Sequence, residues 1–267
     1  MADERARSRR AGGPPGLRTA AVHGALDAFA ARRSAELGRP LRVLDLGGGT
    51  GGTAVPLAVA GHDVTVVDPS PDALASLRRR AAETDTSGRI HPVQGDTDTL
   101  RDLGVGGELA ADGEPAAYDL VCLHGTLEVV DDPDAAMAGI ATVLAPGGTL
   151  SLVVAQRLPA ALARALAGQF ARAQAILERP DGRWGDDDPA PRRFDENVVL
   201  DLLRTHGFTT VDSHGVRIFS DLVPSALVDS EADRAALLEL EEVASRHLGH
   251  PLLGDLGSVR HVLATRG

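Results

Sequence analysis

The chain has 267 residues and a formal net charge of −11, with 27 basic against 38 acidic residues, so its bulk charge does not favour electrostatic capture of nucleic acid. Its composition, 43% hydrophobic and 24% charged, excludes wholesale disorder and suits one large α/β domain or two small ones. No apolar run approaches the roughly 20 residues of a membrane helix, and MADERARSRR is not a secretory signal, so we expect a cytoplasmic protein that does not enter the membrane.

The first part of the chain predicts alternating strands and helices. Residues 1–15 combine arginines with Gly and Pro and predict a mobile arm. A helix is expected over 24–37, and helices should also follow Ser70-Pro71-Asp72 and Asp132-Pro133-Asp134, which read as N-caps with a proline in the first turn. Short apolar runs between them predict buried parallel strands at Leu41–Leu46, Val64–Val67, Ile90–Val93, Leu120–Leu123 and Leu150–Val154. The Gly-rich, acidic stretch 104–117 predicts a surface loop.

Repeated β–α units with right-handed crossovers predict a doubly wound, Rossmann-like α/β fold with seven strands. The pattern changes after the fifth strand, where residues 159–178 are expected to be helical and 179–193 to form a loop. We interpret residues 16–267 as a single domain that carries a helical insertion at about 155–194. Further expected elements are a helix at 196–205, strands near 209–219 and 259–265, and a helix at 231–247.

A glycine loop after the first strand carries the strongest functional signal. Asp45, Gly47, Gly49 and Gly51 fit the spacing D-x-G-x-G-x-G, and Gly47, Gly49 and Gly52 also fit the dinucleotide fingerprint G-x-G-x-x-G. Glycines allow the unusual φ angles of a tight strand-to-helix turn and let a ligand approach the backbone. The loop predicts a nucleotide-like ligand.

Three aspartates refine the nature of this ligand. Asp68 ends the second strand, about 20 residues after the glycines, where a carboxylate can accept hydrogen bonds from ribose hydroxyls. Asp45 suits a ligand with a cationic amino group, such as S-adenosylmethionine, and suits a pyrophosphate poorly because like charges repel. Asp96 follows the third strand, where it either meets an adenine amino group or caps a loop.

From about Leu41 to Val154 the chain resembles the class I S-adenosylmethionine-dependent methyltransferases. The resemblance implies that Gly47, Gly49 and Gly51 line the methionine moiety, Asp68 holds the ribose and Asp96 faces the adenine. It also places His124, in LHGTLEVVDDP, near the cofactor. The remaining alternatives are a nicotinamide-dependent oxidoreductase and a protein that binds a nucleotide without catalysis.

Several further segments resemble the bacterial methyltransferases that esterify 5-carboxymethoxyuridine at the tRNA wobble position. They are Gly16-Leu17-Arg18, His124–Glu128, Ala167–Phe170, Gly215–Phe219, Ala236–Glu241 and His261. The resemblance implies that Arg18 helps to hold the cofactor. It also makes tRNA a candidate partner, while the acidic run Asp186–Asp188 lies where those enzymes tend to be basic and would repel phosphates. A small-molecule acceptor therefore stays open as the alternative.

The acceptor decides which catalytic groups are needed. A carboxylate is ionised at neutral pH and needs no general base, but it needs a cation that orients it, for which Arg217 is the candidate. A hydroxyl or amine acceptor would need a base, for which His124, His214 or His261 could serve. Cys122 is expected to be a buried core residue, and no cluster of His and Cys at ligand spacing predicts a metal.

Overall fold

The structure is a computed structural model that describes residues 15–97, 100, 117–224, 227–246 and 251–267. Within these ranges, no helix has the length and apolar character needed to cross a membrane. The chain forms two compact units. The sheet unit consists of Ala25–Val154, Glu196–Ser213 and Val262–Gly267, and the insertion unit of Met1–Gly24, Ala155–Asp195 and His214–His261. The expected insertion at 155–194 falls in the second unit, and the assignment of 16–267 to a single domain stays a prediction.

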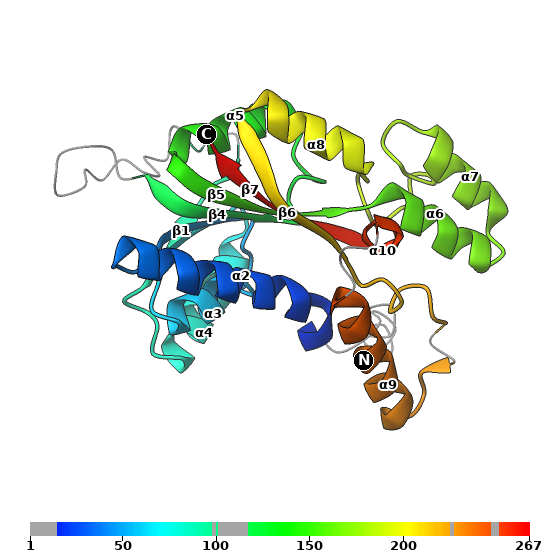
Figure 1. The fold of residues 1–267 in the computed structure, drawn as a ribbon, viewed down its shortest axis with the longest axis horizontal. Coiled ribbons are helices and arrows are strands. Elements are labelled where there is room, and N and C mark those ends of the chain that lie inside the picture. Colours follow the sequence, from blue (N-terminus) through cyan, green and yellow to red (C-terminus); the bar gives the residue numbers. More distant parts are fainter. Residues whose placement is uncertain (1–14, 98–99, 101–116, 225–226, 247–250) are drawn as a thin grey trace. The chain divides into compact units, whose positions relative to one another are not determined.

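Helices and strands alternate along the first half of the chain (Figure 1). In chain order the elements are α2 (Pro15–Leu37), β1 (Arg42–Leu46), α3 (Ala54–Val59), β2 (Asp63–Asp68), α4 (Pro71–Glu83), β3 (Ile90–Gln94), β4 (Tyr118–His124), α5 (Pro133–Val143), β5 (Leu144–Ala155), α6 (Arg157–Leu166), α7 (Phe170–Glu178), α8 (Glu196–Thr205), β6 (Phe208–Val216), α9 (Glu231–Arg246), α10 (Pro251–Leu256) and β7 (Val259–Arg266).

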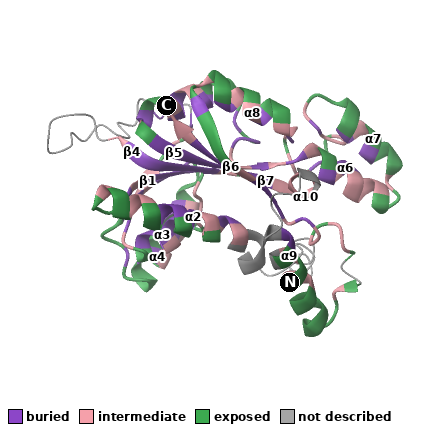
Figure 2. Ribbon diagram, viewed as in Figure 1, coloured by how far each residue is buried: buried purple, intermediate pink, exposed green. Residues whose placement is uncertain are grey.

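The seven strands form one sheet in the order β3-β2-β1-β4-β5-β7-β6. The pairs β1–β2, β2–β3, β1–β4 and β4–β5 are all parallel. In the sheet unit, α3 and α4 cover one face and α5 and α8 the other, as Figure 1 shows. Strands of the centre are buried (Figure 2), because helices shield both of their faces from water. The predicted doubly wound, seven-stranded α/β fold is confirmed.

Local sequence signals explain where the helices of the sheet unit begin. The Ser70 hydroxyl accepts a hydrogen bond from the Ala73 N–H at the start of α4, and the Asp132 carboxylate caps α5 in the same way. A proline occupies the first turn of each helix, where its missing N–H costs nothing. Both predicted N-caps are confirmed.

The structure also departs from the expected elements. The stretch 159–178 is two helices, since Gly168 has a left-handed φ of 72° that ends the first of them. The strand expected over 209–219 stops at Val216, because Arg217 has a φ of 61° and cannot continue an extended backbone. Helix α10 was not expected. The predicted arm (except Pro15) and nearly all of the loop 104–117 lie outside the described residues.

In the insertion unit, the loop between α7 and α8 is built around a buried ion pair. Asp188 accepts two hydrogen bonds from the Arg193 guanidinium, at 2.7 and 3.0 Å, and two more from the N–H groups of Trp184 and Ala190. Burial has the largest single effect on the pKa of Asp188 and raises it. The N–H donors and Arg193 together outweigh burial and hold this pKa below its ordinary value. Of the run Asp186–Asp188, which was expected to repel phosphates, Asp188 is therefore buried and paired with Arg193.

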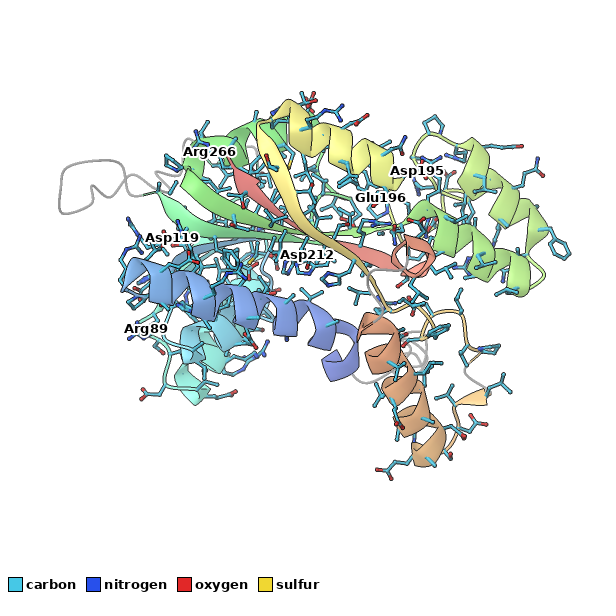
Figure 3. All side chains as sticks on the ribbon, viewed as in Figure 1. Arg89, Asp119, Asp195, Glu196, Asp212 and Arg266 are labelled. Carbon is cyan, nitrogen blue, oxygen red and sulfur yellow. The ribbon has the colours of Figure 1, made fainter. Side chains whose placement is uncertain are left out.

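The start of β4 is fixed to the end of α2 by another carboxylate, Asp119, which Figure 3 labels. Its oxygens accept hydrogen bonds from both terminal nitrogens of Arg39, at 2.7 and 2.9 Å, and from the Arg42 N–H. The side chain of Asp119 is 4% exposed. It therefore joins β1, β4 and the segment after α2 at one point.

We expect Asp119→Ala to lower the free energy of unfolding by about 2–3 kcal/mol, because the Arg39 guanidinium and the Arg42 N–H lose their acceptor. The matched control is Asp63→Ala, since the pair of Asp63 with Arg89 is about half exposed and should contribute less than about 1 kcal/mol. Urea denaturation measures both. Equal losses for the two variants would contradict this account of the β4 start.

Candidate active site

A cavity of about 490 Å³ opens at the carboxyl ends of the first strands of the sheet unit. Parallel strands bring their carboxyl ends to one edge, which is where open α/β sheets bind ligands. The wall is formed by residues from the ends of β1 to β4 and the loops that follow them: Leu46, Gly47, Val67, Asp68, Pro69, Gly95, Asp96, Thr97, His124, Gly125, Thr126, Val129, Val130 and Asp131.

The glycine loop turns sharply between β1 and α3. Gly47, Gly49 and Gly51 have φ angles of 69°, 55° and 84°, which side chains other than glycine rarely allow. A Cβ on Gly47 would lie 2.2 Å from the Thr126 hydroxyl, and one on Gly51 would lie 2.4 Å from a methyl group of Leu77. Gly47 lines the cavity, whereas Gly51 lets α4 pack closely on the loop.

Asp68 connects this loop to the start of α4. One of its carboxylate oxygens accepts the Gly49 N–H and the other accepts the Ser70 N–H, each at 2.9 Å. The side chain lines the cavity, and Asp68 is 8% exposed. Because each carboxylate oxygen has two lone pairs, Asp68 can still accept hydrogen bonds from hydroxyl groups of a ligand.

Asp45 lies beneath the loop and does not line the cavity. It is 1% exposed, and its Oδ2 atom has no hydrogen-bond partner among the described residues. Burial, with a contribution from the negative charge of Asp68, raises its pKa to about 7 against the opposing hydrogen bond of the Ala54 N–H. Asp45 is thus an acid that can change its charge near neutral pH.

His124 is held by hydroxyl groups on both sides of its ring. Its Nδ1 lies 3.2 Å from the Thr53 Oγ1, and its Nε2 lies 2.9 Å from the Ser151 Oγ. Thr126 donates a hydrogen bond to the Leu46 carbonyl and covers Gly47. None of these hydroxyl residues was predicted as a site residue. Thr53 is the N-cap of α3 and Ser151 lies inside β5, so only Thr126, two residues after β4, stands at a strand end that could have identified it.

The structure brings four of the expected cofactor residues together at the cavity: Gly47, Asp68, Asp96 and His124. Gly49 contacts Asp68 through its N–H but does not line the cavity. Arg18 belongs to α2, and its side chain lies outside the described part of the structure. The roles of all these residues toward a ligand remain proposals.

Arg217 lies in the insertion unit, just beyond the end of β6. Its guanidinium pairs with Asp221, and its left-handed φ of 61° is strained for a residue with a side chain. It lines a cavity of about 590 Å³ formed by residues of the insertion unit. The buried His214 and His261 belong to the same unit but do not line this cavity, and they contact each other with 3.3 Å between their ring nitrogens.

The sheet-unit cavity has the chemistry of a site for a cationic nucleoside. Asp68, Asp96 and Asp131 line it, and Asp45 lies beneath it, so the pyrophosphate of a dinucleotide would meet like charges. Hydroxyl groups and a cation match these carboxylates, and about 490 Å³ is within the usual range of small-ligand pockets. The residues present therefore fit S-adenosylmethionine.

Comparisons with known proteins agree with this chemistry. A family described as "Methyltransferase domain" matches residues 19–213. The tRNA 5-carboxymethoxyuridine methyltransferase of Escherichia coli (strain K12) is 31% identical over 233 residues, which are 87% of this chain and 83% of that protein. The ubiquinone biosynthesis O-methyltransferase of Xanthomonas campestris pv. campestris (strain B100) is 34% identical over 129 residues, 48% of each chain.

Solved structures show the same fold. Magnesium protoporphyrin IX methyltransferase from Synechocystis PCC 6803, solved with bound SAH, aligns with a TM-score of 0.57 at 17% identity, over 100% of this chain and 94% of the other. A structure from Galdieria sulphuraria, described as a "putative sarcosine dimethylglycine methyltransferase", aligns with a TM-score of 0.55 at 17% identity, over 91% of this chain and 85% of the other. The chain belongs to the S-adenosylmethionine-dependent methyltransferases.

Proposed function

We propose that this methyltransferase esterifies a carboxylate on a modified wobble uridine of tRNA. The observation that carries the proposal is the extent of similarity to the Escherichia coli tRNA 5-carboxymethoxyuridine methyltransferases. It covers 233 residues, more than the span 19–213 matched by the methyltransferase domain alone. Similarity outside the common domain favours a shared acceptor, because cofactor binding is common to the whole family.

S-adenosylmethionine supplies an already activated methyl group. We propose that Asp68 accepts hydrogen bonds from the ribose hydroxyls and that Asp96 faces the adenine. Gly47 and Gly49 offer backbone without side chains, and the Asp45 charge beneath the loop favours the ammonium group. Arg18, Gly51 and His124 complete the proposed set. The protein's task is then to orient the acceptor and to exclude water.

A carboxylate acceptor agrees with the histidine geometry. Both ring nitrogens of His124 are engaged by hydroxyl groups, and His214 and His261 are buried against each other. Removing a proton from a hydroxyl or amine acceptor requires a base within hydrogen-bond reach of it. A carboxylate is already ionised and needs only to be oriented, for which Arg217 stays the proposed residue.

The net charge of −11 and the pI near 5.2 favour a second candidate, a small carboxylic acid as acceptor. Labelled S-adenosylmethionine distinguishes the two when it is incubated with tRNA lacking the methyl ester and, separately, with a small-metabolite extract. We expect label in an alkali-labile ester of the tRNA nucleoside. Label that enters only the metabolite fraction would remove the tRNA acceptor.

We expect Asp68→Asn to weaken S-adenosylmethionine binding at least tenfold, which corresponds to about 1.4 kcal/mol. The amide nitrogen cannot accept a hydrogen bond, so one of the two backbone N–H groups also loses its acceptor and the unfolding free energy falls by about 1–3 kcal/mol. Calorimetry and urea denaturation measure the two effects. The control Asp85→Asn, at an exposed residue that does not line the cavity and whose positive φ suits Asn as well as Asp, should change both little. Wild-type affinity in Asp68→Asn would contradict the ribose role.

The raised pKa of Asp45 makes stability depend on pH. The pKa of Asp45 is about 7 in the folded state and has an ordinary value of 3.8, so the folded state binds more protons between these values. Stability therefore falls as the pH rises through this window. The slope should approach about 1.4 kcal/mol per pH unit and should be largely lost in Asp45→Asn. Urea denaturation from pH 4 to 8 measures it, and identical slopes for the two proteins would contradict the assignment.

We expect Arg217→Lys to lower turnover strongly while cofactor affinity stays nearly unchanged. Lysine keeps the charge and the backbone strain, but it loses the planar fork that fixes the two oxygens of a carboxylate. Steady-state kinetics with tRNA and calorimetry with S-adenosylhomocysteine separate the two quantities. Equal turnover of both proteins would remove Arg217 from the acceptor site.

A further inference from the structure

Among the described residues that line the insertion-unit cavity, one cation has no carboxylate at ion-pair distance. Three arginines line this cavity, Arg164, Arg193 and Arg217. Arg193 is paired with Asp188 and Arg217 with Asp221. Within the described part of the chain, the Arg164 guanidinium has no carboxylate at ion-pair distance and no hydrogen-bond acceptor. This positive charge is therefore balanced only at longer range, by the Asp188 carboxylate that pairs with Arg193.

Arg164 is nevertheless held in place. Its guanidinium carbon lies 4.0 Å from the centre of the Trp184 ring, and the same ring is 4.9 Å from Arg193. Stacking on indole leaves the edge of a guanidinium, with its N–H groups, available to a ligand. Burial and the neighbouring charge of Arg193 lower the pKa of Arg164 against the opposing charge of Asp188. On balance the surroundings disfavour the charge of Arg164, and an anion would relieve this.

The cavity wall also carries polar atoms that lack partners. The Arg217 Nε, the Trp184 Nε1 and the Ser258 Oγ are buried and have no hydrogen-bond partner among the described residues. The first two can only donate, and the hydroxyl can donate as well. Buried polar groups without a hydrogen-bond partner are uncommon in native structures and need an explanation. These three groups can each donate a hydrogen bond, so they complement a ligand group that is rich in acceptors, such as a carboxylate. The rest of the wall is largely apolar, with Ala160, Ala163, Leu222, Val223, Pro224 and Leu256 among its residues.

The loop that carries Arg217 is preorganised. The Glu241 carboxylate of α9 accepts hydrogen bonds from the N–H groups of Ile218, Phe219 and Ser220, at 2.6 to 3.0 Å. These bonds fix the backbone directly after Arg217, whose strained φ they help to maintain. A side chain held in this way loses little conformational freedom on binding a ligand.

We propose that this cavity is the binding site for the acceptor carboxylate, with Arg164 as its principal anchor and Trp184 as the platform that holds the anchor. Arg217 contributes the second cation, whose charge Asp221 already balances in part. The proposal rests on the carboxylate acceptor of the proposed function, and it assigns that carboxylate to residues of the insertion that the sequence analysis did not single out.

Trp184 is the only tryptophan of the chain, so its fluorescence reports on this cavity directly. The full-length protein is titrated with the nucleoside 5-carboxymethoxyuridine and, as matched probes, with uridine and uridine 5′-monophosphate. We expect a saturable change with the carboxylate nucleoside and little with uridine. Arg164→Met and Arg164→Gln should each weaken this binding about tenfold, as expected for the loss of one charge-assisted hydrogen bond.

The control variant is Arg172→Met. Arg172 also lies over Trp184, at 5.8 Å, but it is exposed and does not line the cavity, so this variant should bind like the wild type. Wild-type affinity in both Arg164 variants would overturn the proposal. Binding of 5-carboxymethoxyuridine no tighter than uridine would overturn it as well, and the monophosphate alone binding through Arg164 would assign the cavity to phosphate instead.

Transfer of the labelled methyl group to tRNA distinguishes a failure of the proposed carboxylate site from a failure of the proposed function. Methylation of tRNA by the wild type that is unaffected in the Arg164 variants would leave the proposed function intact and remove this site. Carboxylate binding that depends on Arg164, together with no methylation of tRNA, would leave the site and remove the tRNA acceptor.

Discussion

The two oxygens of the Asp68 carboxylate each accept a backbone N–H, one from the glycine loop and one from the segment that starts α4. Three left-handed glycines in a loop of a few residues are entropically costly to order, and a buried acceptor at the end of the neighbouring strand offsets part of that cost. The same carboxylate lines the cavity. One side chain therefore shapes the loop and presents its remaining lone pairs to the ligand.

The charged residues that line the two cavities differ in net sign. In the sheet unit, the cavity is lined by Asp68, Asp96 and Asp131, which suits a cationic cofactor. In the insertion unit, the cavity is lined by Arg164, Arg193, Arg217 and Asp221, and among the described residues Arg164 has no carboxylate at ion-pair distance. The bulk charge of −11 conceals this division, since an electrostatic site depends on the groups within a few ångströms and much less on the sum over the chain. The proposed transfer of a methyl group from a sulfonium donor to a carboxylate would use an acidic site for the donor and a basic site for the acceptor.

Periodicity and capping signals were sufficient to predict most of the fold. Buried parallel strands are continuous apolar runs, and Ser70 and Asp132 with their following prolines mark helix starts within the local sequence. Features that depend on contacts distant in sequence were missed. The strand end at Arg217 follows from a left-handed φ that residues of another helix help to fix, and no local pattern announces it.

At the candidate site too, the residues that were predicted follow local sequence patterns, and the features that were missed depend on contacts between residues far apart in the sequence. The glycine loop, Asp68, Asp96 and His124 follow strands at recognisable spacing, and the structure brings Gly47 and these three side chains to one cavity. The hydroxyl groups around His124 come from positions 71 and 27 residues away, so the sequence alone did not reveal that both ring nitrogens are engaged. The burial of Asp188 was missed for a similar reason, since three adjacent aspartates look alike until one of them meets Arg193.

The central claim is that the cavity at the ends of β1 to β4 holds the cofactor. Hydrogen exchange with and without saturating S-adenosylhomocysteine tests it most directly, because it reads the backbone of each segment without any substitution. The account predicts slower exchange in Leu46–Gly52, at the Ser70 amide and around Gly95–Thr97. Unchanged exchange in these segments, with protection confined to the insertion unit, would contradict it.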